Sequence, residues 1–145
     1  MPPIREQAVD RMRRDHEYII ELARRIKASC TQGNDIDNCN ECRPNQRQVC
    51  HGNIEHLIRT FVEATQKHHL IESLLMEDGV PQPHRIAHRR AHVDLTGQMK
   101  AIRVVFSADG NCIVAIEGID NILKTLLAHF EEYDQELEKY LLVPA

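Results

Sequence analysis

The sequence predicts an all-α fold, an up-down-up-down four-helix bundle with a long cysteine-rich loop between the first two helices. Four long segments carry apolar residues at helical spacing, and no segment shows the alternation typical of a β-strand. Most connections between these segments are short, which favours antiparallel neighbours. A chain of 145 residues is long enough for one domain with an ordinary core, so we expect residues 1–145 to form a single domain.

The first helix is expected over residues 4–29, after Pro2 and Pro3. Charged residues occupy its other faces, and His16 is the single ionisable residue in its apolar row. A lone core histidine is usually satisfied by a neighbour, so this residue alone indicates no function. The inward row comprises Val9, Met12, His16, Ile19, Ala23 and Ile26.

Residues 30–51 interrupt the helical pattern. The segment is polar and rich in turn-forming residues, and Cys39 and Cys42 form a Cys-x-x-Cys pair within it. A connection of this length in a compact helical protein tends to carry a function. Its cysteines are Cys30, Cys39, Cys42 and Cys50.

The second helix, expected over residues 52–77, contains a histidine and a glutamate in its apolar row. His68 and Glu72 are four residues apart, so their side chains leave the same face one turn apart. A buried ionised carboxylate costs several kcal/mol unless it is paired or binds a metal. A simple His–Glu hydrogen bond would also satisfy both side chains. The choice between such a hydrogen bond and a metal site therefore depends on the residues of the other helices. The row runs through Ile54, Ile58, Phe61, Thr65, His68, Glu72 and Leu75.

The third and fourth helices are expected over residues 84–106 and 113–142, with a turn between them. Each places side chains of the metal-ligand type on or beside its apolar row. These are His88 and His92 in the third helix, and His129 and Asp134 in the fourth.

Seven residues with metal-ligand side chains, five imidazoles and two carboxylates, are therefore expected to face one core. Convergence of this many ligand types from four helices favours a metal site over a set of structural histidines. Seven protein ligands are too many for one tetrahedral zinc ion. They suit two six-coordinate iron ions that share both carboxylates and an oxo or hydroxo bridge. The set is His16, His68, Glu72, His88, His92, His129 and Asp134.

The motifs also distinguish this site from the carboxylate-rich class of di-iron bundle. Ferritin-like di-iron proteins use Glu-x-x-His motifs. None of the nine histidines here has a glutamate three residues before it. We interpret the site as nitrogen-rich, suited to binding dioxygen rather than to attacking C–H bonds.

In these motifs the sequence resembles the hemerythrin family. A histidine, His-x-x-x-Glu, His-x-x-x-His and His-x-x-x-x-Asp follow one another over residues 15–134, nearly the whole chain. Each motif is weak alone, but the ordered set is specific. The matching stretches are Asp15-His16, His68 to Glu72 followed by Met76, His88 to His92, and His129 to Asp134.

The resemblance implies a role for each of the seven residues. One iron would be bound by three histidines and the other by two, and the two-histidine iron would accept dioxygen. Glu72 and Asp134 would bridge the two ions. The three histidines are His88, His92 and His129, and the two are His16 and His68.

Three features depart from the family pattern. His69 stands where the family usually has phenylalanine, which predicts a more polar pocket wall. His84 makes a competing pair with His88, but we prefer His88 and His92, because the second and third helices must present their ligands at the same distance from the turn at residues 77–83. The third departure is the cysteine-rich loop, which classical hemerythrins lack.

The loop cysteines have three interpretations, which remain open. Cys30, Cys39, Cys42 and Cys50, or three of these cysteines together with His51, would hold a structural zinc ion, because Cys-x-x-Cys is half of such a site. Alternatively they form reversible disulfides that act as a redox switch. The third interpretation is a set of scattered reduced thiols.

Several other residues are expected to have structural roles. Cys112 should pack as a small apolar side chain at the start of the fourth helix, and Tyr133 should pack beside the site. We expect the surplus histidines to lie at the surface or behind the ligands. These are His51, His56, His69 and His84.

Composition argues against several classes of partner. The formal charge is −4 and basic residues are interspersed with acidic ones, so we expect no nucleic-acid partner. No apolar run approaches the ~18 residues of a membrane span, and the first residues do not resemble a signal peptide. We expect a cytoplasmic protein, in which thiols serve metals or redox switching more often than structural bridges.

The leading functional hypothesis is a non-haem di-iron protein that binds dioxygen reversibly, for storage, delivery or sensing, and is not an enzyme. One alternative is a sensor of dioxygen, redox state or nitric oxide that acts through the cysteine loop. Another is a di-iron enzyme that consumes peroxide or nitric oxide. A stable coloured form under air would favour carriage, whereas its rapid loss with turnover would favour the enzyme.

Overall fold

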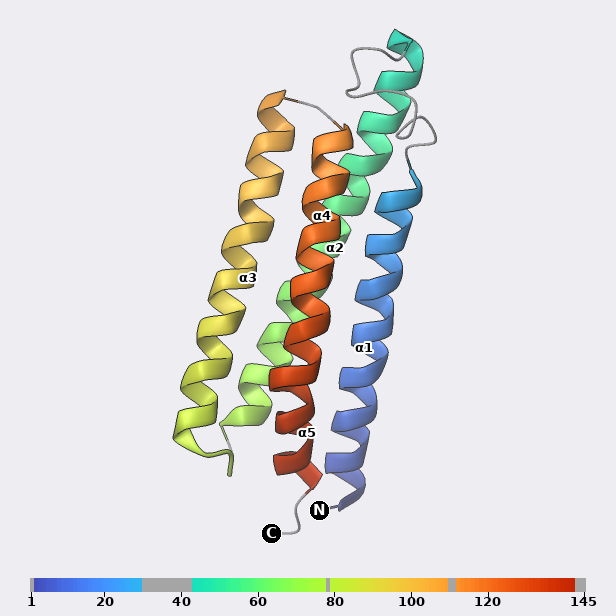
Figure 1. Ribbon diagram of the computed structural model, residues 1–145. Helices are drawn as coiled ribbons and strands as arrows, with labels where there is room; N and C mark the ends of the chain where they lie inside the picture. Colours follow the sequence, from blue (N-terminus) through green and yellow to red (C-terminus); the bar gives the residue numbers. More distant parts are fainter. Residues whose placement is uncertain (1, 30–42, 78, 110–111, 143–145) are drawn as a thin grey trace.

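A computed structural model describes residues 2–29, 43–77, 79–109 and 112–142, which form a four-helix bundle (Figure 1). No strand occurs within these ranges, so the predicted all-α class is confirmed. The fourth helix is continuous but changes its winding near its end. The elements are α1 (Pro2–Ala28), α2 (Pro44–Met76), α3 (Gln82–Asp109), α4 (Cys112–His129), the π-helical turn η2 (Phe130–Asp134) and α5 (Gln135–Leu142).

Successive helices run in opposite directions, as the up-down-up-down prediction requires (Figure 1). The helix α1 packs against α2 and α4, and α3 packs against the same two helices. In the turn between α2 and α3, Gly79 has a φ of 80°, a conformation that glycine adopts without steric cost. Within the described residues, no helix has both the length and the apolar character needed to cross a membrane.

The start of the second helix differs from the prediction. The helix α2 begins at Pro44 rather than near residue 52. Proline suits the first position of a helix, because its φ is preset and its missing N–H has no partner to lose there. The residues that follow are mostly polar, so the apolar periodicity behind the prediction does not extend over them. In Figure 1 this first part of α2 extends beyond the ends of the other helices.

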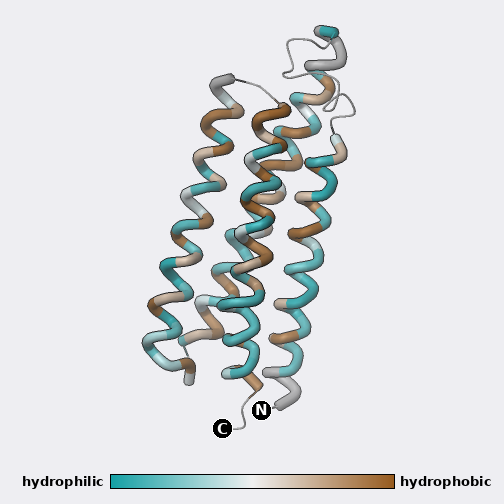
Figure 2. Tube along the Cα trace, in the orientation of Figure 1, coloured by the Kyte–Doolittle hydropathy of each residue, from teal (hydrophilic) through white to brown (hydrophobic). Residues whose placement is uncertain are grey.

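The core consists of two apolar clusters at different levels of the bundle. Along α1, Met12 belongs to the smaller cluster and Ile19 to the larger, with His16 between them. Figure 2 shows hydrophobic residues recurring along the helices, as a buried face requires. Each fully buried large apolar side chain contributes roughly 1.5–3 kcal/mol. The clusters therefore hold the four helices together on both sides of a polar layer.

Candidate metal centre

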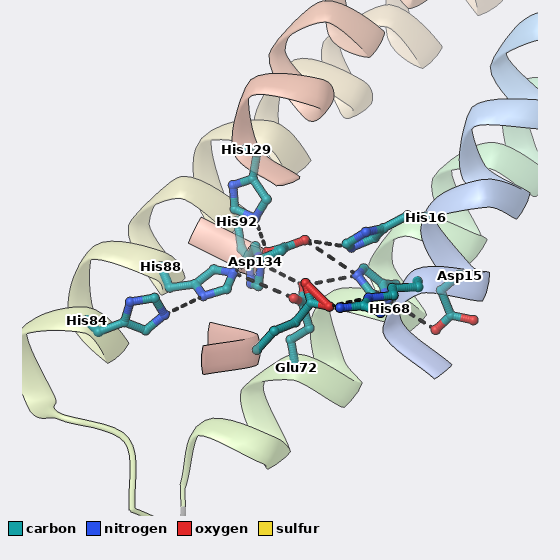
Figure 3. A network of polar contacts seen from close by, with 11 residues as sticks. Asp15, His16, His68, Glu72, His84, His88, His92, His129 and Asp134 are labelled. Carbon is teal, nitrogen blue, oxygen red and sulfur yellow. Dashed lines mark hydrogen bonds and ion pairs between the residues drawn. The ribbon is translucent and has the colours of Figure 1, made fainter. Parts of the chain in front are cut away.

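The seven predicted ligand residues lie together in this polar layer, between the two apolar clusters (Figure 3). Their side chains form two groups, and within each group the ligand atoms lie within 4.8 Å of one another. The carboxylates of Glu72 and Asp134 belong to both groups. The first group adds His88, His92 and His129, and the second adds His16 and His68.

Asp134 approaches imidazoles of both groups. Its Oδ1 lies 2.8 Å from Nε2 of His88 and 3.1 Å from Nε2 of His129. Its Oδ2 lies 2.8 Å from Nε2 of His16 and 3.8 Å from Nε2 of His68. One oxygen of Asp134 therefore faces each group.

Glu72 also joins the two groups. Its Oε1 lies 3.2 Å from Nε2 of His68 and 3.3 Å from Nε2 of His92. Its Oε2 lies 3.8 Å from Nε2 of His88. Glu72 and Asp134 are both 0% exposed, so solvent does not compensate either carboxylate.

These contacts have ion-pair distances, but they are not hydrogen bonds. Within the described part of the chain, Nε2 of all five histidines and all four carboxylate oxygens are buried without a hydrogen-bond partner. Buried polar atoms are nearly always satisfied, and each unsatisfied group costs about 1–3 kcal/mol. A cation at each group would accept these lone pairs, because imidazole nitrogen and carboxylate oxygen are common metal ligands. The residues present therefore fit a metal centre.

The π-helical turn η2 brings His129 and Asp134 to the same site. In a regular α-helix, residues five apart point about 140° away from each other. A π-turn instead pairs residue i with residue i+5, and such turns are frequent at functional sites. The five-residue spacing is the sequence signal of this turn, which the prediction of a uniform helix over residues 113–142 missed.

Electrostatics distinguish the two carboxylates. Burial raises the pKa of Glu72 well above its usual range. Burial also opposes ionisation of Asp134, but the close imidazoles of His129 and His16 outweigh it and hold the pKa of Asp134 well below its usual range. Burial likewise lowers the pKa of His68, yet its contacts with Asp134 and Glu72 prevail and raise that pKa to about 10. The layer therefore stabilises an anion at Asp134, the form that binds a metal.

A carboxylate outside the seven residues orients His68. Nδ1–H of His68 donates a hydrogen bond of 3.1 Å to Oδ2 of Asp15, which also accepts one from Arg11 at its other oxygen. A metal-binding histidine commonly donates its second ring N–H in this way, which fixes the ring and directs the other nitrogen toward the metal. Asp15 was predicted only as part of the Asp15-His16 motif. Its hydrogen bond with His68 was not predicted, because this contact joins α1 to α2 and spacing along one helix does not reveal it.

His84 lies behind His88 rather than in the ligand layer. Its Nε2 is 3.0 Å from Nδ1 of His88, and it belongs to neither ligand group. With Nε2 of His88 directed at the centre, Nδ1–H of His88 donates to Nε2 of His84. His84 therefore positions the His88 ring.

Replacing His84 with alanine is expected to leave the metal content per chain unchanged. The variant removes a partner of His88 but no ligand atom, so the roughly 10–100-fold loss of metal affinity that follows still leaves the centre filled when metal is supplied in excess. His92→Ala, the matched variant one turn beyond His88, should lose metal. Metal analysis of both proteins checks this assignment. If His84→Ala empties the centre and His92→Ala does not, the ligand pair on α3 is misassigned.

His69 is buried beside the centre. Its exposed fraction is 6%, and its ring stacks on that of His92 with centroids 3.8 Å apart and planes 9° apart. Burial and the nearby His129 lower the pKa of His69 to about 3, so the ring is neutral near pH 7. The histidine in place of the usual family phenylalanine thus makes the wall behind His92 polar.

Two other surplus histidines lie away from the centre. His56 is exposed, and His51 stacks on Phe106 with ring centroids 4.5 Å apart. Tyr133 packs beside the site, where its ring centroid lies 5.1 Å from that of His129.

Most of the cysteine loop lies outside the described residues. This applies to Cys30, Cys39 and Cys42, so the zinc and redox interpretations stay predictions. Cys50 is half-buried on α2 and packs against the larger apolar cluster. Cys112 is buried in that same cluster at the start of α4, as predicted.

A four-helix bundle with a buried layer of histidines and carboxylates defines a class of metal-binding helical proteins. The family model described as the hemerythrin HHE cation-binding domain matches residues 7–141. The chain therefore belongs to the hemerythrin family, and it is a metal-binding protein. No significant match to the chain was found among curated proteins or among solved structures.

Proposed function

We propose that this protein binds two iron ions in the polar layer and uses them to bind dioxygen reversibly. The observation that carries this proposal is the sharing of both carboxylates by two ligand groups with unequal numbers of imidazoles. When bound there, a pair of ferrous ions supplies the two electrons for reversible dioxygen binding. His88, His92 and His129 would hold one ion, His16 and His68 the other, and Glu72 and Asp134 both.

The ligand chemistry supports iron as the bound metal and reversible dioxygen binding as the function. Imidazole suits iron, and shared carboxylates offset the positive charge of two neighbouring cations in an apolar core. Five imidazoles against two carboxylates make this centre richer in nitrogen than the carboxylate di-iron bundles with Glu-x-x-His motifs. A four-coordinate zinc site would leave several of these ligands without a metal.

A cavity of about 380 Å³ reaches His16 of the two-imidazole group. Because this group has fewer protein ligands, its ion would retain an open position. A small molecule that enters the cavity therefore meets the ion best able to accept it. Its lining includes Arg13, His16, Phe130, Gln135, Glu138 and Lys139.

Two contacts lie beside His16 at this cavity. The ring of Phe130 stacks on that of His16 with centroids 3.7 Å apart and planes 12° apart. Nε–H of Arg13 donates a hydrogen bond of 2.7 Å to Oε1 of Glu138, joining α1 to α5. The Phe130 ring covers one face of the His16 imidazole. The Arg13–Glu138 ion pair joins α1, which carries His16, to α5.

The test is the visible spectrum of reduced, iron-loaded protein before and after exposure to air. We expect an absorption band that appears with dioxygen and disappears when dioxygen is removed, through repeated cycles. His16→Ala should abolish the band, because the accepting ion loses one of its two imidazoles. His56→Ala, which changes an exposed histidine, is the matched control and should keep it.

A different result would favour enzymatic turnover. If reductant and dioxygen, peroxide or nitric oxide are consumed continuously and no stable coloured form accumulates, reversible carriage is wrong. The same spectra then show whether the iron pair is present. They therefore distinguish an error in the proposed reaction from an error in the proposed metal.

A further inference from the structure

The ligand histidines differ in the groups that lie behind them. An imidazole that binds a metal through Nε2 has a second ring nitrogen, and a hydrogen bond donated by that N–H makes the ring a stronger donor to the metal. A carboxylate acceptor has a larger effect than a neutral one, because a hydrogen bond to an ionised group is roughly twice as strong. The acceptors behind the two ligand groups therefore influence how much electron density each ion receives.

A carboxylate lies behind the two-imidazole group. Asp15 accepts the hydrogen bond of 3.1 Å from Nδ1–H of His68, a side chain that is only 1% exposed. Arg11 pairs with the other oxygen of Asp15, but its side chain is 47% exposed. Solvent screens the charge of Arg11 more than it screens the buried side of Asp15. Part of the negative charge of Asp15 therefore remains effective at the His68 ring.

The three-imidazole group has no such acceptor. The partner of Nδ1 of His88 is the imidazole of His84, at 3.0 Å, which carries no negative charge in either protonation state. Within the described residues, Nδ1 of His92 and Nδ1 of His129 are buried without a hydrogen-bond partner. Asp15 and His84 lie at opposite ends of the ligand layer (Figure 3).

The carboxylates of the centre itself do not distinguish its two halves. Glu72 and Asp134 belong to both groups, and the additional imidazole of the three-imidazole group adds a donor atom but no charge. Among the residues that the structure describes, Asp15 is the one carboxylate outside the centre that hydrogen-bonds to a ligand histidine. A nearby negative charge favours the more positive, oxidised state of an ion. Its effect therefore acts mainly on the two-imidazole half.

We propose that Asp15 is a positioning residue that acts through His68 and makes the two-imidazole half of the centre the easier half to oxidise. This inference rests on the proposed di-iron centre. The half that loses its electron first is then the half with the open position, which a small molecule approaches through the cavity at His16. Asp15 thus directs electron transfer to the half that accepts dioxygen.

An anaerobic redox titration of the reduced, iron-loaded protein tests this proposal. A one-electron chemical oxidant removes one electron from each iron, in two steps that the visible spectrum follows. Asp15→Asn keeps an oxygen that accepts the hydrogen bond but removes the charge. We expect its first oxidation to become about tenfold less favourable, which is about 59 mV for one electron, while the second step is little changed.

Two further variants separate the charge of Asp15 from its packing. Asp15→Glu keeps the charge and should return the first step to nearly the potential of the parent. Asp10→Asn removes an exposed carboxylate from the same helix and should leave both steps unchanged. A role of Asp15 in packing alone would lower the iron content or shift both steps together, and the shift would not follow the charge.

The partner of His88 allows the converse test. His84→Glu places a carboxylate behind the three-imidazole half and should make the second oxidation about tenfold more favourable, so that the two steps move closer together. His84→Gln provides a neutral acceptor instead and should move this step far less. The iron content of each variant is measured in parallel, with iron supplied in excess.

Two results would overturn the proposal. One is an unchanged first step in Asp15→Asn when two irons are bound. The other is a shift of the second step in place of the first, which would assign the easier oxidation to the three-imidazole half. Neither result bears on reversible dioxygen binding, because the titration is anaerobic. A parent that binds no iron pair contradicts the proposed function instead, so the two failures are distinguishable.

Discussion

Replacing Glu72 with alanine is expected to empty both halves of the metal centre. Its carboxylate is fully buried and belongs to both ligand groups, so its loss removes a ligand from each ion and one of the two negative charges that compensate them. The fall in metal affinity should exceed the roughly 10–100-fold that follows loss of an outer hydrogen-bond partner. Metal analysis after equilibrium dialysis measures it.

Two further variants separate ligand loss from general damage. Glu72→Gln keeps the size of the side chain and removes its charge, so it should also lose metal without leaving a cavity. Glu63→Ala changes an exposed carboxylate on the same helix and should keep the full metal content. A Glu72→Ala protein that still binds two ions per chain would show that this carboxylate is not shared.

Removing the metal is expected to lower the melting temperature by about 10 °C or more. Without cations, the imidazole nitrogens and the oxygens of Glu72 and Asp134 remain buried and unsatisfied. A ligand present at 1,000 times its Kd stabilises the folded state by about 4 kcal/mol. For a chain of this length, each kcal/mol shifts the melting temperature by about 2–4 °C. Thermal unfolding with and without a chelator measures the shift.

Restoring the metal should restore the melting temperature of the parent. Glu72→Ala should melt at the same temperature with and without chelator, because it has no bound metal to lose. If the parent binds metal and yet melts at one temperature in both conditions, the polar layer is stabilised by its own ion pairs and the metal contributes nothing to folding.

Apolar periodicity predicted the helices well where the buried row extends over the whole element. The first, third and fourth helices begin and end within three residues of the expected bounds. The second helix does not, because α2 begins at Pro44 and its first residues are mostly polar, without the apolar spacing on which the prediction rested. Periodicity reports burial, so it does not detect a helical segment that extends past the core.

The candidate site likewise combines contacts that spacing along one helix predicts with contacts that it does not. Residues four apart, such as His68 and Glu72, were predicted to share a face because an α-helix places them there. The meeting of His129 with Asp134 needs a π-turn, and the spacing that signals it was in the sequence. His69, about 100° around α2 from His68, is buried because α3 packs on that side. Such contacts depend on how helices are rotated against each other, which spacing along one helix does not determine.

Metal analysis of protein loaded anaerobically with iron tests the di-iron centre most directly. The expected result is two irons per chain, one for each ligand group, with zinc absent from the polar layer. Glu72→Ala, analysed in parallel, corrects for iron bound elsewhere on the chain. One zinc ion per chain and no iron would contradict the proposed centre.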